Sequence, residues 1–265
     1  MGWARAAAAL ALAASLAATA LVRPAAAVAQ PTAELSAAFS PDRPGANTTV
    51  KFTLALSGSQ GGPPPPLTSL GFRLPVGMDL VDSQLGLAIC SVARLRAHGA
   101  SACPPDSRLG MGRTRVTFTF GPGLAEAEAR VEAFLGEVPG PGLSVLIYVE
   151  VISPVFAVFV FPSRLVDDAM PFGEELNMPL PLIPTLPEAP DLSITRLKVS
   201  FGPRGLVYSR RVHGHTIRFA PRGLSVPERC PRGGFPFDIA VGFLGGERTL
   251  ASTLVKCPSR LPAGR

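Results

Sequence analysis

From Gln30 onwards, hydrophobic and polar residues alternate in short segments that are separated by turn residues. The clearest segment is 47–57, where Val50, Phe52 and Leu54 alternate with threonine and lysine. A period of two places the apolar side chains on one face of a strand and the polar ones on the other. We predict further strands at 68–75, 85–90, 113–120, 125–133, 144–152, 155–161, 174–182, 192–201, 206–212, 215–219, 235–243 and 248–256.

Segment 125–133 has two readings, because its alanines and glutamates are good helix formers. Small and charged residues nevertheless alternate strictly along it, which is the period of a strand, and we predict a strand. One short helix is predicted at 91–98, where Val92 and Leu95, and Arg94 and His98, have helical spacing.

Roughly a dozen strands without long helices between them predict an all-β fold, an antiparallel β-sandwich of Ig-like or jelly-roll-like type. The segments 144–152 and 155–161 are apolar on both faces, which is typical of a sandwich interior or a subunit contact. Sandwiches of this length often form one domain, so residues 30–265 are predicted to be a single domain.

A β-hairpin is predicted around Gly214. A two-residue loop at His213 and Gly214 places Val212 opposite His215 and Tyr208 opposite Phe219. The alternative is that His213 and His215 bind a metal ion, but a third ligand is missing from this segment. The sequence therefore favours a turn here.

The first 29 residues have the three-part layout of a secretory signal peptide. Arg5 precedes an apolar run at 6–22, and Ala27-Val28-Ala29 ends the segment. We predict cleavage after Ala29 and a secreted, extracellular protein. An uncleaved anchor is the alternative, because the run has about the minimum length that spans a bilayer.

All four cysteines follow this leader: Cys90, Cys103, Cys230 and Cys257. In an oxidising compartment such cysteines are expected to form disulfides, and four of them allow three connectivities. We favour Cys90 with Cys103 and Cys230 with Cys257, because the members of each pair are near in sequence. Zinc binding is disfavoured, since the cysteine spacings do not match a zinc motif.

Several short motifs of this chain resemble motifs of a known group of proteins. They are Leu74-Pro75-Val76-Gly77, then Cys90, then Cys103-Pro104 with Ser107 to Gly110, and the late segments Cys230-Pro231 and Cys257-Pro258. Together they resemble uncharacterised exported β-sandwich proteins of high-GC bacteria. The resemblance implies the fold and export, and it implies no activity.

Charge is distributed unevenly along the chain. The leader carries two arginines and no acid, so its removal lowers the formal net charge from +6 to +4. Segment 196–232 is basic, and Arg210, Arg211 and Arg218 are the candidate contacts for an anionic ligand. Strand alternation places Arg210 and Arg218 on one face and Arg211 on the other. An anionic envelope polymer or another envelope protein is the candidate partner; nucleic acid is not expected, because aromatic residues do not interleave with these arginines.

The sequence offers little catalytic chemistry. It has three histidines and no Gly-x-Ser-x-Gly motif. A glycosidase needs paired carboxylates beside sugar-stacking rings, but the only tryptophan is Trp3 in the leader. The acidic candidates are Glu126, Glu128, Glu132, Asp167, Asp168, Glu174 and Glu175. We therefore expect a non-enzymatic protein without cofactor or metal, with a binding or structural role at the cell exterior. The alternative is a hydrolase acting on envelope polymers.

Overall fold

The computed structural model describes residues 30–40, 47–78, 88–120, 122–137, 140, 143–153, 156–183, 192–202, 208–219, 224–227 and 229–257. The predicted signal peptide, residues 1–29, and the first half of the strand predicted at 85–90 lie outside these residues; of the second half, only Cys90 takes part in a β-bridge. No helix in the described part of the chain is long and apolar enough to cross a membrane.

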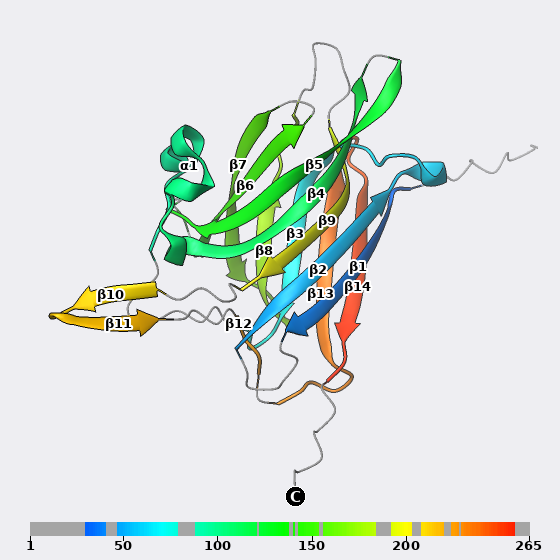
Figure 1. The fold of residues 1–265 in the computed structure, drawn as a ribbon. Helices are drawn as coiled ribbons and strands as arrows, with labels where there is room; N and C mark the ends of the chain where they lie inside the picture. Colours follow the sequence, from blue (N-terminus) through cyan, green and yellow to red (C-terminus); the bar gives the residue numbers. More distant parts are fainter. Residues whose placement is uncertain are drawn as a thin grey trace, which may run out of the picture.

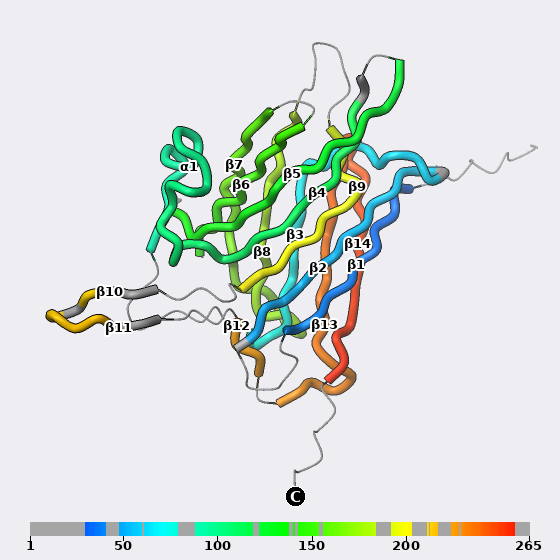
Figure 2. The backbone as a smooth tube through the Cα atoms, viewed as in Figure 1, coloured from blue at the N-terminus to red at the C-terminus, as the bar shows by residue number. Residues whose placement is uncertain are grey.

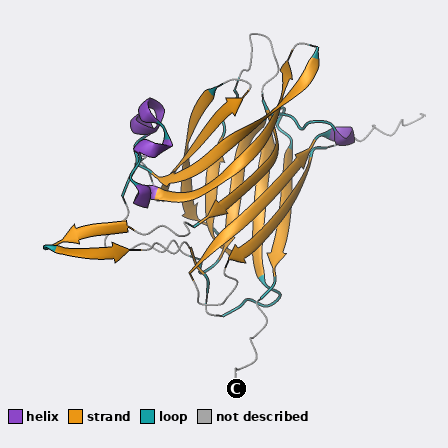
Figure 3. Cartoon of the chain, in the orientation of Figure 1, coloured by secondary structure: helices purple, strands orange, loops and turns teal. Residues whose placement is uncertain are grey.

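Strands dominate the described residues, in which helix is confined to one short segment and three single turns (Figure 3). The helix is α1 (Val92–His98), and the 3-10 turns are Ser59–Gly61, Ala100–Ala102 and Pro105–Ser107. The strands are β1 (Thr32–Ser40), β2 (Asn47–Ser57), β3 (Leu67–Pro75), β4 (Arg108–Phe120), β5 (Gly123–Leu135), β6 (Leu143–Ser153), β7 (Ala157–Asp167), β8 (Phe172–Pro179), β9 (Ser193–Phe201), β10 (Tyr208–Val212), β11 (His215–Phe219), β12 (Leu224–Ser225), β13 (Phe235–Phe243) and β14 (Arg248–Val255).

One large antiparallel sheet forms the body of the molecule (Figure 1). Its strand order is β1-β2-β9-β4-β5-β6-β7-β8-β3-β13-β14, and β12 pairs with β2 beside this path. The edge strands β1 and β14 lie next to each other, so the sheet curls into a nearly closed, barrel-like shape (Figure 2). Strands β10 and β11 form a separate hairpin.

The mostly antiparallel β fold and the short helix are confirmed, whereas the β-sandwich layout is not. Two strands, each of which pairs on both sides, account for the difference. Strand β9 pairs with both β2 and β4, and β3 pairs with both β8 and β13, so hydrogen bonding continues around the sheet. The strands therefore form one wrapped sheet instead of two separate ones.

Phenylalanines fill part of the inner face of this sheet. The rings of Phe52 and Phe72 have centroids 4.1 Å apart, and Phe237 lies 5.6 Å from Phe52. Phe39 and Phe235 form a further edge contact at 5.2 Å. Such edge-to-face pairs contribute about 0.5–1.5 kcal/mol beyond the burial of their area. They join β1, β2, β3 and β13 across the interior.

Segment 125–133 is a strand, as predicted, and its alternating residues face opposite sides of the sheet. Ala127 and Ala129 are buried on the inner face of β5. Glu126 and Glu128 face outwards, where Arg115 lies 3.9 Å and 3.5 Å from their carboxylates. Packing on one face and solvated ion pairs on the other therefore override the helix preference of alanine and glutamate.

Part of the outer face of β5, β6 and β7 is covered by α1 and its flanking turns, and Figure 1 shows α1 beside β6 and β7. Phe134, Leu146 and Tyr148 are almost fully buried there, together with Leu95 of the helix. Burial raises the pKa of the Tyr148 hydroxyl above its ordinary value. This cover explains why the sequence is apolar on both faces at 144–152 and 155–161.

Local signals position α1. Ser91 caps its start, since the Ser91 hydroxyl accepts a hydrogen bond from the Arg94 N–H at 3.2 Å. Gly99 ends it with a φ of 73°, a conformation that suits glycine. The disulfide between Cys90 and Cys103 then ties both sides of the helix to the sheet, where the Cys90 N–H donates to the Leu135 carbonyl at 2.9 Å.

Candidate ligand-binding cavity

The wrapped sheet encloses a cavity of about 160 Å³. Its lining is made almost entirely of apolar side chains from the inner face and from the segments at one end of the strands. The lining residues are Leu35, Phe52, Leu54, Pro66, Leu67, Leu70, Phe72, Leu74, Gly110, Met111, Thr114, Val116, Val131, Ala133, Ile147, Val149, Phe159, Phe161, Leu165, Leu176, Met178, Leu180, Pro181, Leu182, Ile183, Leu192, Ile194, Leu197, Val199, Ser200, Phe201 and Ile239.

The cavity lies where two neighbouring strands present small side chains inwards. In β4 these are Gly110 and Thr114, and in β5 the partner of Gly110 is Ala133. Small inward side chains such as Thr114 and Ala133 fill less of the interior of a ring of strands than leucine or phenylalanine would. The sequence of β4 and β5 thus accounts for space in the interior.

Several inward-facing side chains next to this wall are only half-buried. Ile147, Val149 and Phe159 belong to the inner registers of β6 and β7, yet they are less buried than Val145 on the same face. Leu197 and Val199 on β9 show the same partial burial. Because they also line the cavity, the free area of these side chains faces the internal space.

The cavity meets the surface at one end of the sheet. Pro181 and Leu182, which follow β8, both line the cavity and are exposed. Met111, the third exposed residue of the described lining, lies on the outer register near the start of β4, away from this end. Pro66 and Leu192 lie at the same strand ends as Pro181.

The lining carries no ionisable side chain among the residues that the structure describes. Its only side-chain polar groups are the hydroxyls of Thr114 and Ser200. The Thr114 hydroxyl donates to the Arg196 carbonyl at 3.0 Å, so its hydrogen bond is already used within the sheet. A site of this composition offers a ligand dispersion contacts and burial of apolar area.

Both favoured cysteine pairs are confirmed. Cys90 is bonded to Cys103 and Cys230 to Cys257, with Cα atoms 5.3 Å and 5.9 Å apart. Two disulfides indicate that the chain folds in a non-reducing compartment. Their role is structural: the first holds the α1 cover, and the second joins the ends of the β13–β14 hairpin.

The basic hairpin has the predicted register, with Tyr208 opposite Phe219 and Val212 opposite His215. The predicted distribution of its arginines is wrong. Arg218 pairs with Ser209 and Arg210 with Ile217, so positions 211 and 218 share one face and position 210 lies on the other. Across this two-residue turn, even-numbered residues of one strand pair with odd-numbered residues of the other. Even and odd numbers therefore do not mark the same face in both strands, as the prediction assumed.

The histidine and carboxylate candidates lie away from the cavity. His213 and His215 are exposed at the hairpin turn, where His213 has a φ of 48° and Gly214 one of 83°. His98 ends α1. The described residues contain no group of three His, Cys, Asp or Glu side chains placed to hold a metal ion.

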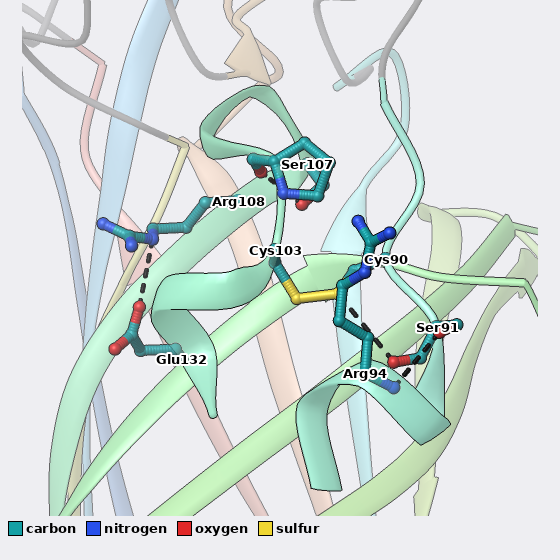
Figure 4. Close-up of a disulfide and its surroundings, with 8 residues drawn as sticks. Cys90, Ser91, Arg94, Cys103, Ser107, Arg108 and Glu132 are labelled. Atoms are coloured by element: carbon teal, nitrogen blue, oxygen red, sulfur yellow. Dashed lines mark hydrogen bonds and ion pairs between the residues drawn. A yellow bond between two sulfur atoms is a disulfide. The ribbon is translucent and has the colours of Figure 1, made fainter. Parts of the chain in front are cut away.

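Four of the carboxylate candidates form ion pairs with arginines: Glu126, Glu128, Glu132 and Asp168. Glu132 lies 3.0 Å from Arg108, as Figure 4 shows. Asp168 accepts a hydrogen bond from Arg73. The structure therefore pairs these acids with arginines, Glu132 in a buried position and the others nearer the surface, and none of them belongs to the cavity lining that the structure describes.

Sequence reasoning missed the cavity, although a signal for it exists. The small residues of β4 and β5 are in phase, so Gly110, Gly112, Ala129 and Ala133 all fall on the inner face once the two strands are paired. The alternation alone indicated a strand. Only the pairing of two small-residue strands indicates an unfilled interior.

Comparisons of this chain with protein-family models, with curated proteins and with solved structures find no match. Its function therefore has to be argued from the chemistry of the cavity.

Proposed function

We propose that this protein binds a small apolar molecule, or the hydrocarbon chain of a larger one, in the cavity inside its sheet. The observation that carries the proposal is the cavity of about 160 Å³ whose described lining is apolar and contains no ionisable group. The protein acts at the cell exterior and without covalent chemistry. The two disulfides support that location, because they form in non-reducing compartments.

The energetics of an empty apolar space favour a ligand. Cavities in protein cores cost about 24 cal/mol per Å³, which for 160 Å³ amounts to roughly 4 kcal/mol. An engineered apolar cavity of about 150 Å³ stays dry and binds benzene. Filling this cavity with a ligand of matching shape therefore recovers dispersion contacts at little desolvation cost.

The hydrolase alternative has less support at this site. Hydrolysis requires a nucleophile with a base, or paired acids, beside the bound bond. The described lining offers only Thr114 and Ser200 as hydroxyls, with no histidine or carboxylate beside them. Binding is the activity that this composition supports.

Titration with the fluorescent probe N-phenyl-1-naphthylamine tests the proposal. The purified protein that starts at Gln30 is expected to enhance the fluorescence of the probe in a saturable manner. Ala133→Phe places a ring in the cavity and is expected to lower the probe affinity at least tenfold. The matched control is Ala240→Phe, since Ala240 is exposed on the outer face of β13 and should bind the probe like the parent protein.

Circular dichroism and an intact disulfide count establish that each variant is folded. If Ala133→Phe does not fold, Val149→Phe, which enlarges a half-buried lining residue, takes its place. The proposal is overturned if the folded parent protein shows no saturable probe binding, or if the cavity variant and the outer-face control bind the probe equally well.

A further inference from the structure

Five large apolar side chains are exposed in the turns at one end of the sheet: Leu124, Ile152, Phe156, Leu182 and Leu244. We call them the rim. Phe156 is 68% exposed and Leu124 is 64% exposed, so solvent reaches most of their surface. Five such side chains gathered at one end of the sheet make this end a candidate interaction site.

The strand registers place all five at the same end. Ile152 and Phe156 flank the turn between β6 and β7, and Leu124 lies at the tip of the β4–β5 hairpin (Figure 1). Ser153 pairs with Glu128, which sets these two hairpins side by side. Leu244 follows β13, whose last residue pairs with Leu67 at the start of β3.

The rim surrounds the cavity opening. Leu182 belongs to both, because it is exposed and also lines the cavity. Pro66 is a lining residue too, and its carbonyl accepts a hydrogen bond at 2.8 Å from the Leu244 N–H. At Leu182 and beside Leu244 the rim therefore adjoins the apolar lining of the cavity.

We infer that this end of the sheet docks on a lipid surface of zwitterionic phospholipid, from which an apolar chain enters the cavity. The inference rests on the proposed function, because it identifies the source of the ligand. A molecule that suits an uncharged apolar cavity is sparingly soluble in water and accumulates in lipid. A binding protein whose opening faces the lipid receives such a molecule without exposing it to water.

The arrangement of the rim favours lipid over a protein partner. Its side chains come from four separate turns and encircle an opening, whereas a protein partner fits a contiguous complementary patch. Separate apolar tips can each enter a fluid interface independently. The binding needs no cation on the protein, and we expect it to persist when salt screens surface charge.

Flotation with phosphatidylcholine vesicles tests the inference, using the protein that starts at Gln30. The parent protein is expected to float with the vesicles in both low and high salt. Ile152→Ser with Phe156→Ser is expected to lower the vesicle partition at least tenfold. That factor corresponds to about 1.4 kcal/mol, which is less than the burial of two such side chains provides.

The matched control is Leu250→Ser with Leu254→Ser. These leucines are also exposed, at 59% and 53%, but they lie along β14, away from the turns that form the rim. This control should float like the parent protein. Equal loss in both double variants, or a parent protein that remains in the bottom fraction, overturns the inference. So does self-association of the parent protein that the rim variant abolishes while vesicle binding is absent.

The probe titration separates this inference from the proposed function. Ala133→Phe should lose the probe and keep vesicle binding, whereas the rim variant should keep the probe and lose the vesicles. Vesicle binding without saturable probe binding supports the docking surface and overturns the proposed function. Probe binding without vesicle binding overturns the docking surface alone.

Discussion

Arg73 of β3 and Asp168, which follows β7, are joined on the outer face of the sheet by a hydrogen bond of 2.5 Å from Nε to Oδ2. The same guanidinium lies 4.2 Å from the centroid of the Phe172 ring and 3.8 Å from Asp238 of β13. The arrangement connects the turn between β7 and β8 to two strands that are far from it in sequence. The hydrogen bond from Arg73 lowers the pKa of the Asp168 carboxyl.

Asp168→Asn is expected to reduce the free energy of unfolding at pH 7 by roughly 1–2 kcal/mol, because a charge-assisted hydrogen bond is replaced by a neutral one at a partly exposed site. The folded-state pKa lies below that of the unfolded chain, so this contribution is present above pH 4 and declines as the pH falls through the folded value. Urea titrations of both proteins between pH 7 and 2 measure it. A difference that grows towards low pH contradicts the assignment, and Glu128→Gln, in an exposed pair, is the control.

Replacing Cys90 and Cys103 by alanine is expected to destabilise the protein by about 2–4 kcal/mol, since the disulfide restricts the unfolded chain and holds the α1 cover over Tyr148 and Phe134. Loosening of that cover should also change the near-ultraviolet signal of Tyr148. Urea denaturation and near-ultraviolet circular dichroism measure the two effects. A loss of stability with an unchanged Tyr148 signal shows that the sheet alone keeps Tyr148 in place.

Gly112→Ala is expected to destabilise the protein by about 1–3 kcal/mol, because a Cβ at this position collides with the backbone carbonyl of Lys198 on β9. Gly123→Ala is the matched control. A Cβ at Gly123 meets nothing within 4 Å, so its substitution should be neutral or slightly stabilising. Thermal unfolding of both variants compares them. Equal midpoints contradict the close approach of β4 and β9.

The exported protein is expected to begin at Gln30 and to contain no free thiol. Intact-mass measurement of material recovered from the culture medium determines the first residue, and alkylation without reductant counts the thiols. A mass that retains residues 1–29 contradicts cleavage after Ala29. Four alkylated cysteines contradict both disulfides.

Charge reversal of Arg210 and Arg211 is expected to leave phosphatidylcholine vesicle binding unchanged and to alter stability by less than about 0.5 kcal/mol. These two positions lie on opposite faces of the hairpin, so the register does not gather them into one patch. Retention on isolated cell envelopes, measured in low and high salt, tests the anionic-polymer hypothesis separately. Salt-sensitive retention that the double reversal abolishes supports a role for the basic hairpin in addition to the rim.

Much of the local structure could be predicted. The bounds of β2 and β13 match their predicted segments, and the capping by Ser91 and Gly99 agrees with the short helix. These features depend on neighbouring residues, so a period of two or a cap residue is enough to indicate them. Strand β1 was not predicted, because alanines occupy half of its inner positions and weaken the alternation of hydrophobic and polar residues.

The sequence by itself determined the alternation of inner and outer residues, the hairpin turn at Gly214, and the nearness of the cysteines that pair. Each of these is a property of residues that are close along the chain. The tertiary structure decided that β9 pairs between β2 and β4 and that β3 pairs between β8 and β13, which wraps the strands into one sheet. It also decided the cavity, since unfilled space depends on which side chains face each other across the interior. Gly110 and Ala133 are small in any fold, but they line a cavity only because the wrapped sheet turns their face inwards.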